Sequence, residues 1–578
     1  MEIKGIAAAS GYGLGYAFLL QEPKVEVIRT ALSQGGIEDE VARFEESVSR
    51  AIFELEAVRK TAGQKLGEDA AAIFSAHIMI LEDPEYIGAI SQKVRQDMIN
   101  AEAAVEEVTK EYVVIFEGMD NEYLRERAAD LKDVSGRLLR QLLGIKTISL
   151  ADVDDNVILC AHDLSPSDTA QIDRGKVAGF VTNIGGRTSH SAIMARSMGI
   201  PAVVGLKDIV DKVKAGDFII VDGTDGKVMV NPPESVIQAY RRKQEAAMTK
   251  KREFEKLLHE KSITRDSVQV ELVANIGNPE DAKGAIANGA EGVGLYRTEF
   301  LYMGRNELPS EEEQFKAYKE VAELFGQNHP VVIRTLDIGG DKELPYLEMP
   351  NEMNPFLGYR AIRLCLDQPE IFKTQLRAIL RASVYGNVKM MYPMIATLQE
   401  LRAANAILSE VKQELATENI NFNSYMEVGI MVEIPAVAAL ASKFAKEVDF
   451  FSIGTNDLVQ YTLAVDRMNE KISYLYQPLN PSVLSLIQNV ITAAHNEHKW
   501  VGMCGEMAGD LTAIPILLGM GLDEFSMSAS SVLAARALIR HLSQADAACI
   551  AQMVHNMDDA EKIKEYVEQA VPFISELR

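Results

Sequence analysis

The fold of the C-terminal half is decided by the stretch that runs from Gly429-Ile-Met-Val-Glu433, through a helical segment, to Phe450-Phe-Ser-Ile-Gly-Thr-Asn-Asp457. Both apolar runs have the length and residue types of buried strands. A carboxylate follows each run, at Glu433 and at Asp457. Because parallel strands end at the same edge of a sheet, the pattern predicts a βαβ unit with two acidic groups at that edge.

Outward from this unit, the same pattern recurs through the last 310 or so residues of the chain. Eight apolar runs, each followed by a helical segment, predict a (β/α)₈ barrel of the TIM type. A doubly wound open sheet is the alternative, although its usual strand number is smaller. The eight predicted strands are 271–275, 292–296, 331–334, 388–392, 429–433, 450–453, 500–504 and 524–527.

The N-terminal half combines strand signals with a long helical region. Apolar residues recur every three or four positions from about Ile37 to Leu143, which is typical of a helical bundle. Strand-like runs on both sides of this region predict one α/β domain with the bundle inserted into it. The predicted α/β multidomain organisation is an α/β domain at 1–35 and 146–231, a helical insert at 36–145, a linker helix at 232–261 and the barrel at 262–578.

Composition excludes several classes of protein. The 578 residues are too many for one core, and 47% apolar with 25% charged residues is typical of soluble globular proteins. A net charge of −25 opposes nucleic-acid binding, which needs a positive field. The four cysteines are far apart, and no signal peptide or membrane-spanning run is present. These features favour a cytoplasmic protein with no membrane insertion.

A second informative motif is Gly185-Gly-Arg-Thr-Ser-His190, between an apolar run at 177–181 and a predicted helix that follows. The two glycines allow the backbone to approach a ligand closely. His190 would lie at a helix start, which attracts anions and favours the neutral form of the imidazole. A neutral imidazole at such a place is suited to carrying a phosphoryl group. A helix cap or a packed core histidine is the alternative.

Charged residues follow the predicted barrel strands at the end where barrel enzymes have their active sites. Arg297, Arg334 and Arg467 would converge there and indicate a small, strongly anionic substrate. Glu433 and Asp457 suit a hard cation such as Mg²⁺. Cys504 is a possible proton donor to carbon, with a buried small hydrophobe as the alternative; for a single arginine or glutamate the alternative is a salt bridge at the barrel rim.

Six motifs resemble enzyme I of the bacterial sugar phosphotransferase system, the phosphoenolpyruvate–protein phosphotransferases. The resemblance runs from Gly5 to the C-terminus, with one departure: Ser10 is followed directly by Gly11, where the family usually has proline between them. The motifs are Gly185-Gly-Arg-Thr-Ser-His-Ser-Ala-Ile-Met-Ala-Arg196, Gly292-Val-Gly-Leu-Tyr-Arg-Thr-Glu-Phe300, Asp337-Ile-Gly-Gly-Asp-Lys342, Asn354-Pro-Phe-Leu-Gly-Tyr-Arg360, Phe451-Ser-Ile-Gly-Thr-Asn-Asp-Leu458 and Gly502-Met-Cys-Gly-Glu506.

The resemblance implies a role for each candidate residue. His190 matches the histidine that is phosphorylated at Nε2, and Cys504 matches the acid that protonates the enolpyruvate. Glu433 and Asp457 match the Mg²⁺ ligands. The residues that match phosphoenolpyruvate-binding positions are Arg297, Arg334, Asn456, Asp457 and Arg467.

The resemblance also implies partners. The phosphoryl acceptor would be the small phosphocarrier protein HPr, bound by the helical insert, and the barrel would form a homodimer. We expect the insert to bind HPr through a hydrophobic strip on its surface. Acidic groups would border this strip, for example Glu68, Asp69, Glu82 and Glu85. Two other readings remain: an ATP-dependent dikinase-like or synthase-like enzyme that lacks its nucleotide domain, and a regulatory phosphoprotein that only senses phosphoenolpyruvate.

Overall fold

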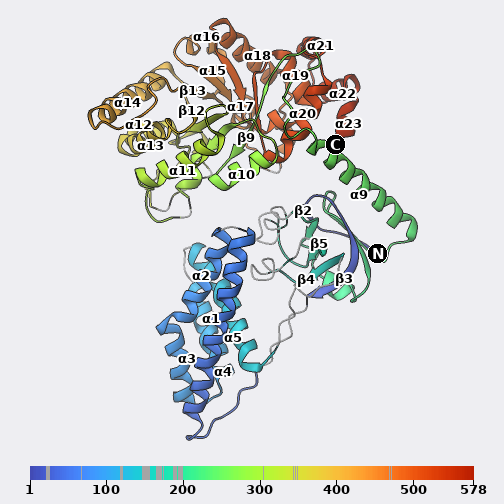
Figure 1. The fold of residues 1–578 in the computed structure, drawn as a ribbon, viewed down its shortest axis with the longest axis vertical. Coiled ribbons are helices and arrows are strands. Elements are labelled where there is room, and N and C mark those ends of the chain that lie inside the picture. Colours follow the sequence, from blue (N-terminus) through green and yellow to red (C-terminus); the bar gives the residue numbers. More distant parts are fainter. Residues whose placement is uncertain are drawn as a thin grey trace. The chain divides into compact units, whose positions relative to one another are not determined.

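The chain is seen in a computed structural model that traces most of its length as helices and strands (Figure 1). Numbering runs from Met1 to Arg578. The described residues are 1–20, 27–66, 68–117, 122–145, 156–164, 172, 175–186, 192, 195, 199–303, 305–340, 342, 344, 346–347, 349–467, 469 and 471–577.

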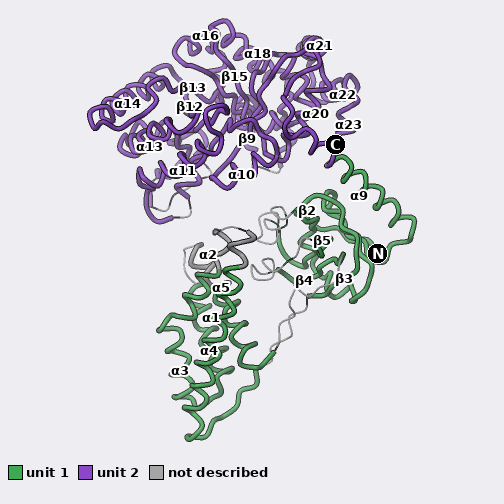
Figure 2. Tube along the Cα trace, viewed as in Figure 1, with its two compact units in different colours: residues 1–250 green, residues 251–578 purple. Residues whose placement is uncertain are grey.

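The chain forms two compact units, residues 1–250 and residues 251–578 (Figure 2). The boundary lies inside helix α9, Glu234–Glu255, which occupies most of the segment expected to be a linker. This helix is rich in Lys, Arg and Glu, and Tyr240 on it is buried among Ile220 and Met229 of unit 1.

Unit 1 contains an eight-stranded sheet with the strand order β1-β8-β7-β3-β4-β5-β6-β2. The strands from β3 to β6 pair in parallel, whereas the other pairs are antiparallel. The elements are β1 Glu2–Lys4, β2 Ile6–Ala9, β3 Tyr12–Leu20, β4 Val157–Ala161, β5 Val177–Thr182, β6 Ala202–Val204, α8 Ile209–Lys212, β7 Phe218–Asp222 and β8 Lys227–Val230.

A helical bundle is inserted between β3 and β4, which are hydrogen-bonded neighbours in the sheet. Its helices bury a core of their own that includes Phe44, Phe74 and Leu138. Asp83 caps α3 by accepting a hydrogen bond from the Glu85 amide, and Pro84 begins the helix. The bundle helices are α1 Ile37–Leu66, α2 Glu68–Glu82, α3 Pro84–Asp97, α4 Ala101–Glu117 and α5 Glu122–Leu143.

Unit 2 is a closed barrel of eight parallel strands in sequence order, so the predicted (β/α)₈ fold is confirmed and the open sheet is wrong. Small residues let the strands pack closely, since a Cβ on Gly294 would clash with Ser526. The strands are β9 Glu271–Ile276, β10 Val293–Arg297, β11 Pro330–Arg334, β12 Asn387–Tyr392, β13 Val428–Val432, β14 Phe450–Ile453, β15 Trp500–Met503 and β16 Glu524–Met527.

Helices surround the barrel and bury one apolar layer against the outer faces of the strands (Figure 1). Side chains inside the barrel form a separate cluster with Leu295, Met431 and Cys504. The helices are α10 Pro279–Ala287, α11 Glu311–Phe325, α12 Ile362–Asp367, α13 Pro369–Ala382, α14 Leu398–Thr417, α15 Pro435–Ala439, α16 Ala441–Phe444, α17 Thr455–Leu463, α18 Pro481–Asn496, α19 Ala513–Met520, α20 Val532–His541, α21 Gln544–His555, α22 Ala560–Ala570 and α23 Phe573–Leu577, with short 3₁₀ turns at 298–301, 355–357, 473–475, 506–509 and 529–531.

Candidate active site

A cavity of about 950 Å³ opens at the carboxyl ends of the barrel strands. It is lined by all seven barrel residues that the sequence analysis singled out for chemistry. His190 lies outside the described residues, as do the segments on both sides of it. The seven residues are Arg297, Arg334, Glu433, Asn456, Asp457, Arg467 and Cys504.

The barrel strands position these side chains by ending at the same rim. Arg297 is the last residue of β10, and Arg334 is the last residue of β11. Glu433 follows β13 directly, and Cys504 follows β15 directly. Asp457 lies in the first turn of α17, just after β14. Side chains from five different strands therefore converge on one cavity, as in other barrel enzymes.

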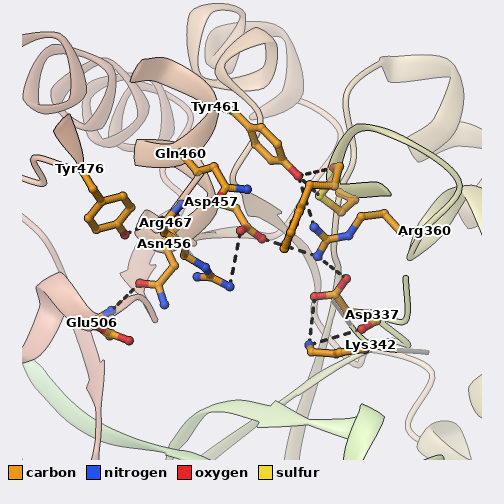
Figure 3. A network of polar contacts seen from close by, with 12 residues as sticks. Asp337, Lys342, Arg360, Asn456, Asp457, Gln460, Tyr461, Arg467, Tyr476 and Glu506 are labelled. Carbon is orange, nitrogen blue, oxygen red and sulfur yellow. Dashed lines mark hydrogen bonds and ion pairs between the residues drawn. The ribbon is translucent and has the colours of Figure 1, made fainter. Parts of the chain in front are cut away.

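A buried network of ion pairs forms one wall of the cavity (Figure 3). Asp337 joins two arginines, because its Oδ2 lies 2.8 Å from Nη1 of Arg334 and its Oδ1 lies 2.8 Å from Nη2 of Arg360. Glu299 pairs with Arg334 at 2.8 Å and with Nζ of Lys342 at 2.7 Å. Except for Lys342, these side chains are almost fully buried, so the network holds Arg334 and Arg360 in fixed positions.

The network also controls the charge of its members. Burial by itself would raise the pKa of Asp337, but Arg334 and Arg360 outweigh burial and hold that pKa well below its usual range. Burial likewise opposes the ionised form of Glu299, and Arg334 with Lys342 lowers its pKa overall. Both carboxylates stay ionised at neutral pH and keep the guanidinium groups charged.

Arg297 and Arg467 have fewer ion-pair partners among the described residues than the two buried arginines, Arg334 and Arg360. Among the described residues Arg297 has no carboxylate partner, its Nε has no hydrogen bond, and its guanidinium lies 5.0 Å from the centre of the Phe300 ring. Arg467 reaches Oδ1 of Asp457 only at 3.9 Å. Both guanidinium groups face the cavity and can bind phosphate or carboxylate oxygens.

Two of the carboxylates that line the cavity, Glu433 and Asp457, fit a divalent cation. Burial, followed by the nearby charges of Asp457 and Asp337, raises the pKa of Glu433 to about 8. One oxygen of Glu433 accepts a hydrogen bond from the Met394 amide, whereas the buried Oδ1 of Asp457 accepts none from the described residues. These two carboxylates, from neighbouring strands, are a suitable pair of oxygen ligands for Mg²⁺.

Cys504 is buried and protonated at neutral pH. Burial is the main cause that raises the pKa of its thiol to about 12, and Arg334 lowers that pKa only in part. Its Sγ lies 3.8 Å from the Ile453 carbonyl, to which the thiol donates. The proton stays on sulfur because desolvation outweighs the charge of the nearby Arg334. The side chain is available as an acid.

Sequence reasoning gave no role to Arg360 or Tyr461, which the structure places in or beside this site, whereas it did assign Asn456 to the substrate. Arg360 comes from the segment between β11 and α12, and its Nη1 donates to the Tyr461 hydroxyl. Oδ1 of Asn456 accepts from the Glu506 amide at 3.0 Å, so this side chain is held in place (Figure 3). The motifs at 292–300, 337–342 and 354–360 contain Glu299, Asp337, Lys342 and Arg360, but the pairing between them needs the folded chain.

Among the described residues, no helix is both long and apolar enough to cross a lipid bilayer.

The chain matches three family descriptions that share one substrate. The PEP-binding domain of PEP-utilising enzymes matches residues 251–544, the N-terminal domain of these enzymes matches residues 4–127, and their mobile domain matches residues 153–226. Together with the barrel and its arginine-lined cavity, these matches define a PEP-utilising enzyme.

Full-length relatives make the assignment more specific. The phosphoenolpyruvate-protein phosphotransferases of Bacillus sp. (strain S) and Geobacillus stearothermophilus are each 56% identical to this chain, over 98% of both partners. That of Staphylococcus carnosus is 55% identical over 98% of this chain and 99% of its own. An Enzyme I protein solved by NMR is 41% identical over 43% of this chain and 99% of its own, with a TM-score of 0.40. The chain belongs to the phosphoenolpyruvate–protein phosphotransferase family.

Proposed function

We propose that this chain transfers the phosphoryl group of phosphoenolpyruvate to its own His190 and then to a histidine of the phosphocarrier protein HPr, releasing pyruvate. This reaction is the first step of the sugar phosphotransferase system. The observation that carries the proposal is the barrel cavity, where arginines, two carboxylates and a protonated thiol meet. The near-complete alignment with phosphotransferases of 55–56% identity supports it.

Phosphoenolpyruvate would bind in the cavity through its phosphate and carboxylate groups. Arg297 and Arg467 line the cavity and can donate N–H groups to the substrate, whereas Arg334 is already oriented by its ion pairs with Glu299 and Asp337. Asn456 adds an amide held by the Glu506 backbone. A preorganised set of donors stabilises the charge that spreads over the equatorial oxygens during phosphoryl transfer.

Glu433 and Asp457 would hold Mg²⁺, the cofactor that this carboxylate pair fits. The bound cation would supply positive charge beside the phosphoryl oxygens. Without that charge, burial and mutual repulsion favour protonation of Glu433 near neutral pH. A cation at this site would therefore favour the ionised form of Glu433.

Cys504 would complete the reaction at carbon. As Nε2 of His190 forms its bond to phosphorus, the bond from phosphorus to the bridging oxygen breaks and leaves the enolate of pyruvate. The electron pair of the enolate then takes the proton of the Cys504 thiol at the methylene carbon, which gives pyruvate and a thiolate. A thiol whose pKa is near 12 keeps its proton until this strongly basic carbon is formed.

The remaining assignments concern whole segments. The helical insert at 36–145 would bind HPr, and the acidic side chains of Glu82 and Glu85 on it are exposed. The side chains of Glu68 and Asp69 lie outside the part that the structure describes. His190 belongs to the α/β domain at 1–35 and 146–231, so it must move between two sites, with the linker at 232–261 as the hinge. The barrel at 262–578 would form a homodimer in a cytoplasmic enzyme.

The proposal is tested by incubating the purified protein with ³²P-labelled phosphoenolpyruvate, Mg²⁺ and HPr. We expect label first on this chain and then on HPr, with one pyruvate released for each phosphoryl group transferred. A chain without residues 36–145 is the control for the acceptor step, because it should still label itself and fail to label HPr. Label transfer to HPr by that deletion variant would disprove the assigned role of the insert.

The same labelling assay distinguishes the proposed phosphotransferase from an ATP-dependent enzyme. An ATP-dependent dikinase-like or synthase-like enzyme would label the chain from γ- or β-labelled ATP. The alignment over 98% of both partners with phosphotransferases does not favour this alternative. Labelling from ATP with no labelling from phosphoenolpyruvate would overturn the proposed function.

A further inference from the structure

A buried glutamine outside the cavity connects the two strands that carry Arg297 and Arg334. Gln375 lies on α13 and is fully buried. Its Oε1 accepts a hydrogen bond from the Leu336 amide at 2.8 Å, and its Nε2 donates to the Thr298 hydroxyl at 3.0 Å. Thr298 directly follows Arg297, and Leu336 directly precedes Asp337. One side chain therefore reaches both strand ends.

The hydrogen bonds continue from Thr298 to the backbone of the other strand. The Thr298 hydroxyl donates its hydrogen to the Arg334 carbonyl at 2.9 Å, so it must accept the hydrogen bond from Gln375. Gln375 thus holds the end of β11 through Thr298 at Arg334, and holds the segment directly after β11 at Leu336. The hydrogen bonds among Gln375, Thr298 and the backbone at Arg334 and Leu336 therefore link the backbone position of Arg334 to that of Arg297.

The residue type at position 375 follows from the same contacts. The Leu336 amide needs an acceptor, and the Thr298 oxygen needs a donor. A glutamine amide provides both at one place, whereas an ionised glutamate provides only acceptors and leucine provides neither. The Nε2 group also donates to the Tyr318 hydroxyl at 3.2 Å. Both N–H donors and the carbonyl oxygen of Gln375 therefore take part in hydrogen bonds.

We propose that Gln375 is a positioning residue for phosphoryl transfer, which sets the relative positions of Arg297 and Arg334 by joining the ends of β10 and β11. This inference rests on the proposed function, because both arginines are there assigned to phosphoenolpyruvate. Phosphoryl transfer depends mainly on the placement of charge around the phosphoryl group, so a small displacement of one arginine lowers turnover more than it lowers ground-state binding.

A second buried glutamine provides a matched control. Gln314 on α11 is as buried as Gln375 and also contacts the Tyr318 hydroxyl. Its remaining contacts are the Tyr302 hydroxyl and the Pro309 carbonyl, and none of its contacts is with Thr298 or Leu336. Replacing Gln314 by leucine therefore has a similar structural cost but leaves both strand ends joined.

The test compares Gln375→Leu with Gln314→Leu in the full-length protein, with pyruvate release and HPr labelling as the assay. We expect Gln375→Leu to lower kcat by about 10- to 100-fold while KM for phosphoenolpyruvate changes less than about threefold. Gln314→Leu should keep kcat within about threefold, even where both variants melt at a similarly lowered temperature. Equal effects of the two variants on kcat would overturn the inference.

A third variant keeps the test decisive if Gln375→Leu does not fold. In Gln375→Glu the protonated carboxyl has one acceptor and one donor, so it can replace the amide, whereas the ionised form cannot donate to Thr298. We expect kcat of Gln375→Glu, relative to wild type, to fall as pH rises, and a constant ratio would contradict the inference. Wild-type protein that releases no pyruvate would disprove the proposed function instead, so the two failures are distinguishable.

Discussion

At the scale of single residues, the chemistry of Cys504 depends on its burial more than on its charged neighbours. The thiol is surrounded by the apolar side chains of the barrel interior, which include Leu295 and Met431. Desolvation therefore keeps the proton on sulfur although Arg334 is near. An acid of this kind is suited to a carbanion-like acceptor and not to general exchange with water.

Replacing Cys504 by serine tests its role as an acid. Serine is almost the same size but is a far weaker acid, so we expect pyruvate release to fall by roughly 10²- to 10⁴-fold, the usual contribution of general acid catalysis. Calorimetric binding of phosphoenolpyruvate and the melting temperature should remain close to those of wild type. Wild-type rates of pyruvate release would show that the cysteine serves only in packing.

Asp337 offers a second test at this scale, because it is shared by two buried arginines. Asp337→Asn would remove the carboxylate that Arg334 and Arg360 share, although Glu299 would still pair with Arg334 and Asp457 lies 3.6 Å from Arg360, so we expect the free energy of unfolding to fall by about 3–5 kcal/mol. The measurement is urea denaturation followed by the fluorescence of Trp500, the single tryptophan of the chain, which lies in β15.

The exposed pair of Arg265 and Asp546 provides the comparison for Asp337→Asn. These side chains meet at 3.2 Å but stay 59% and 67% exposed, so Asp546→Asn should hardly change the denaturation midpoint. If the two asparagine variants had equal midpoints, the buried network would not contribute to stability as we infer.

At the scale of elements, β16 begins with a carboxyl group inside the barrel, at the end opposite to the cavity. Glu524 is 1% exposed, and neither of its carboxylate oxygens has a hydrogen bond to the described residues. Gly502 on β15 leaves room for this carboxyl, because a Cβ there would lie 2.6 Å from its Oε1. Burial, followed by the charge of Glu271 on β9, raises the pKa of Glu524 to about 8.

This raised pKa predicts how barrel stability depends on pH. At Glu524 the folded barrel holds a proton that the unfolded chain has lost, between the ordinary glutamate pKa of about 4.5 and a pH of about 8. Stability should therefore fall as pH rises through this window. Glu524→Gln removes this contribution, so its advantage over wild type should grow by roughly 3 kcal/mol from pH 6 to pH 9, at about 1.4 kcal/mol per pH unit up to the pKa of about 8.

The fluorescence of Trp500 can also follow unfolding in this experiment, because Trp500 lies two residues before Gly502 on β15. Its ring stacks on that of Phe450, with 4.3 Å between the ring centres. Urea midpoints of wild type and Glu524→Gln, followed by its fluorescence at both pH values, give the difference directly. A difference that stays constant with pH would mean that Glu524 is ionised in the folded barrel at pH 6, contrary to the inferred pKa.

At the scale of the whole molecule, the proposed substrate site and the proposed phosphoryl acceptor belong to different compact units. The cavity is lined entirely by residues of unit 2, whereas His190 belongs to the sequence of unit 1. His190→Ala should therefore abolish labelling of the chain and of HPr while leaving calorimetric binding of phosphoenolpyruvate within about twofold. Loss of binding in this variant would mean that the cavity is incomplete without the histidine.

The sequence alone determined the type and order of the elements, because hydrophobic periodicity and strand length are local properties. Strands β14 and β16 have the predicted bounds, and β13 differs by one residue, so that Glu433 follows the strand instead of ending it. Such shifts arise because the last residue of a strand depends on hydrogen bonds to its neighbours. The carboxyl-end rule then placed all seven barrel candidates in one cavity.

Only the tertiary structure decided how those residues are held and charged. Asp337 between two arginines, the closed contacts of Gln375 and the unpartnered carboxyl of Glu524 all depend on segments that are distant in sequence. The protonation of Cys504 likewise follows from desolvation by the folded barrel. Ion pairing and desolvation are set by distance and burial in space, and residue order constrains neither until the barrel has closed.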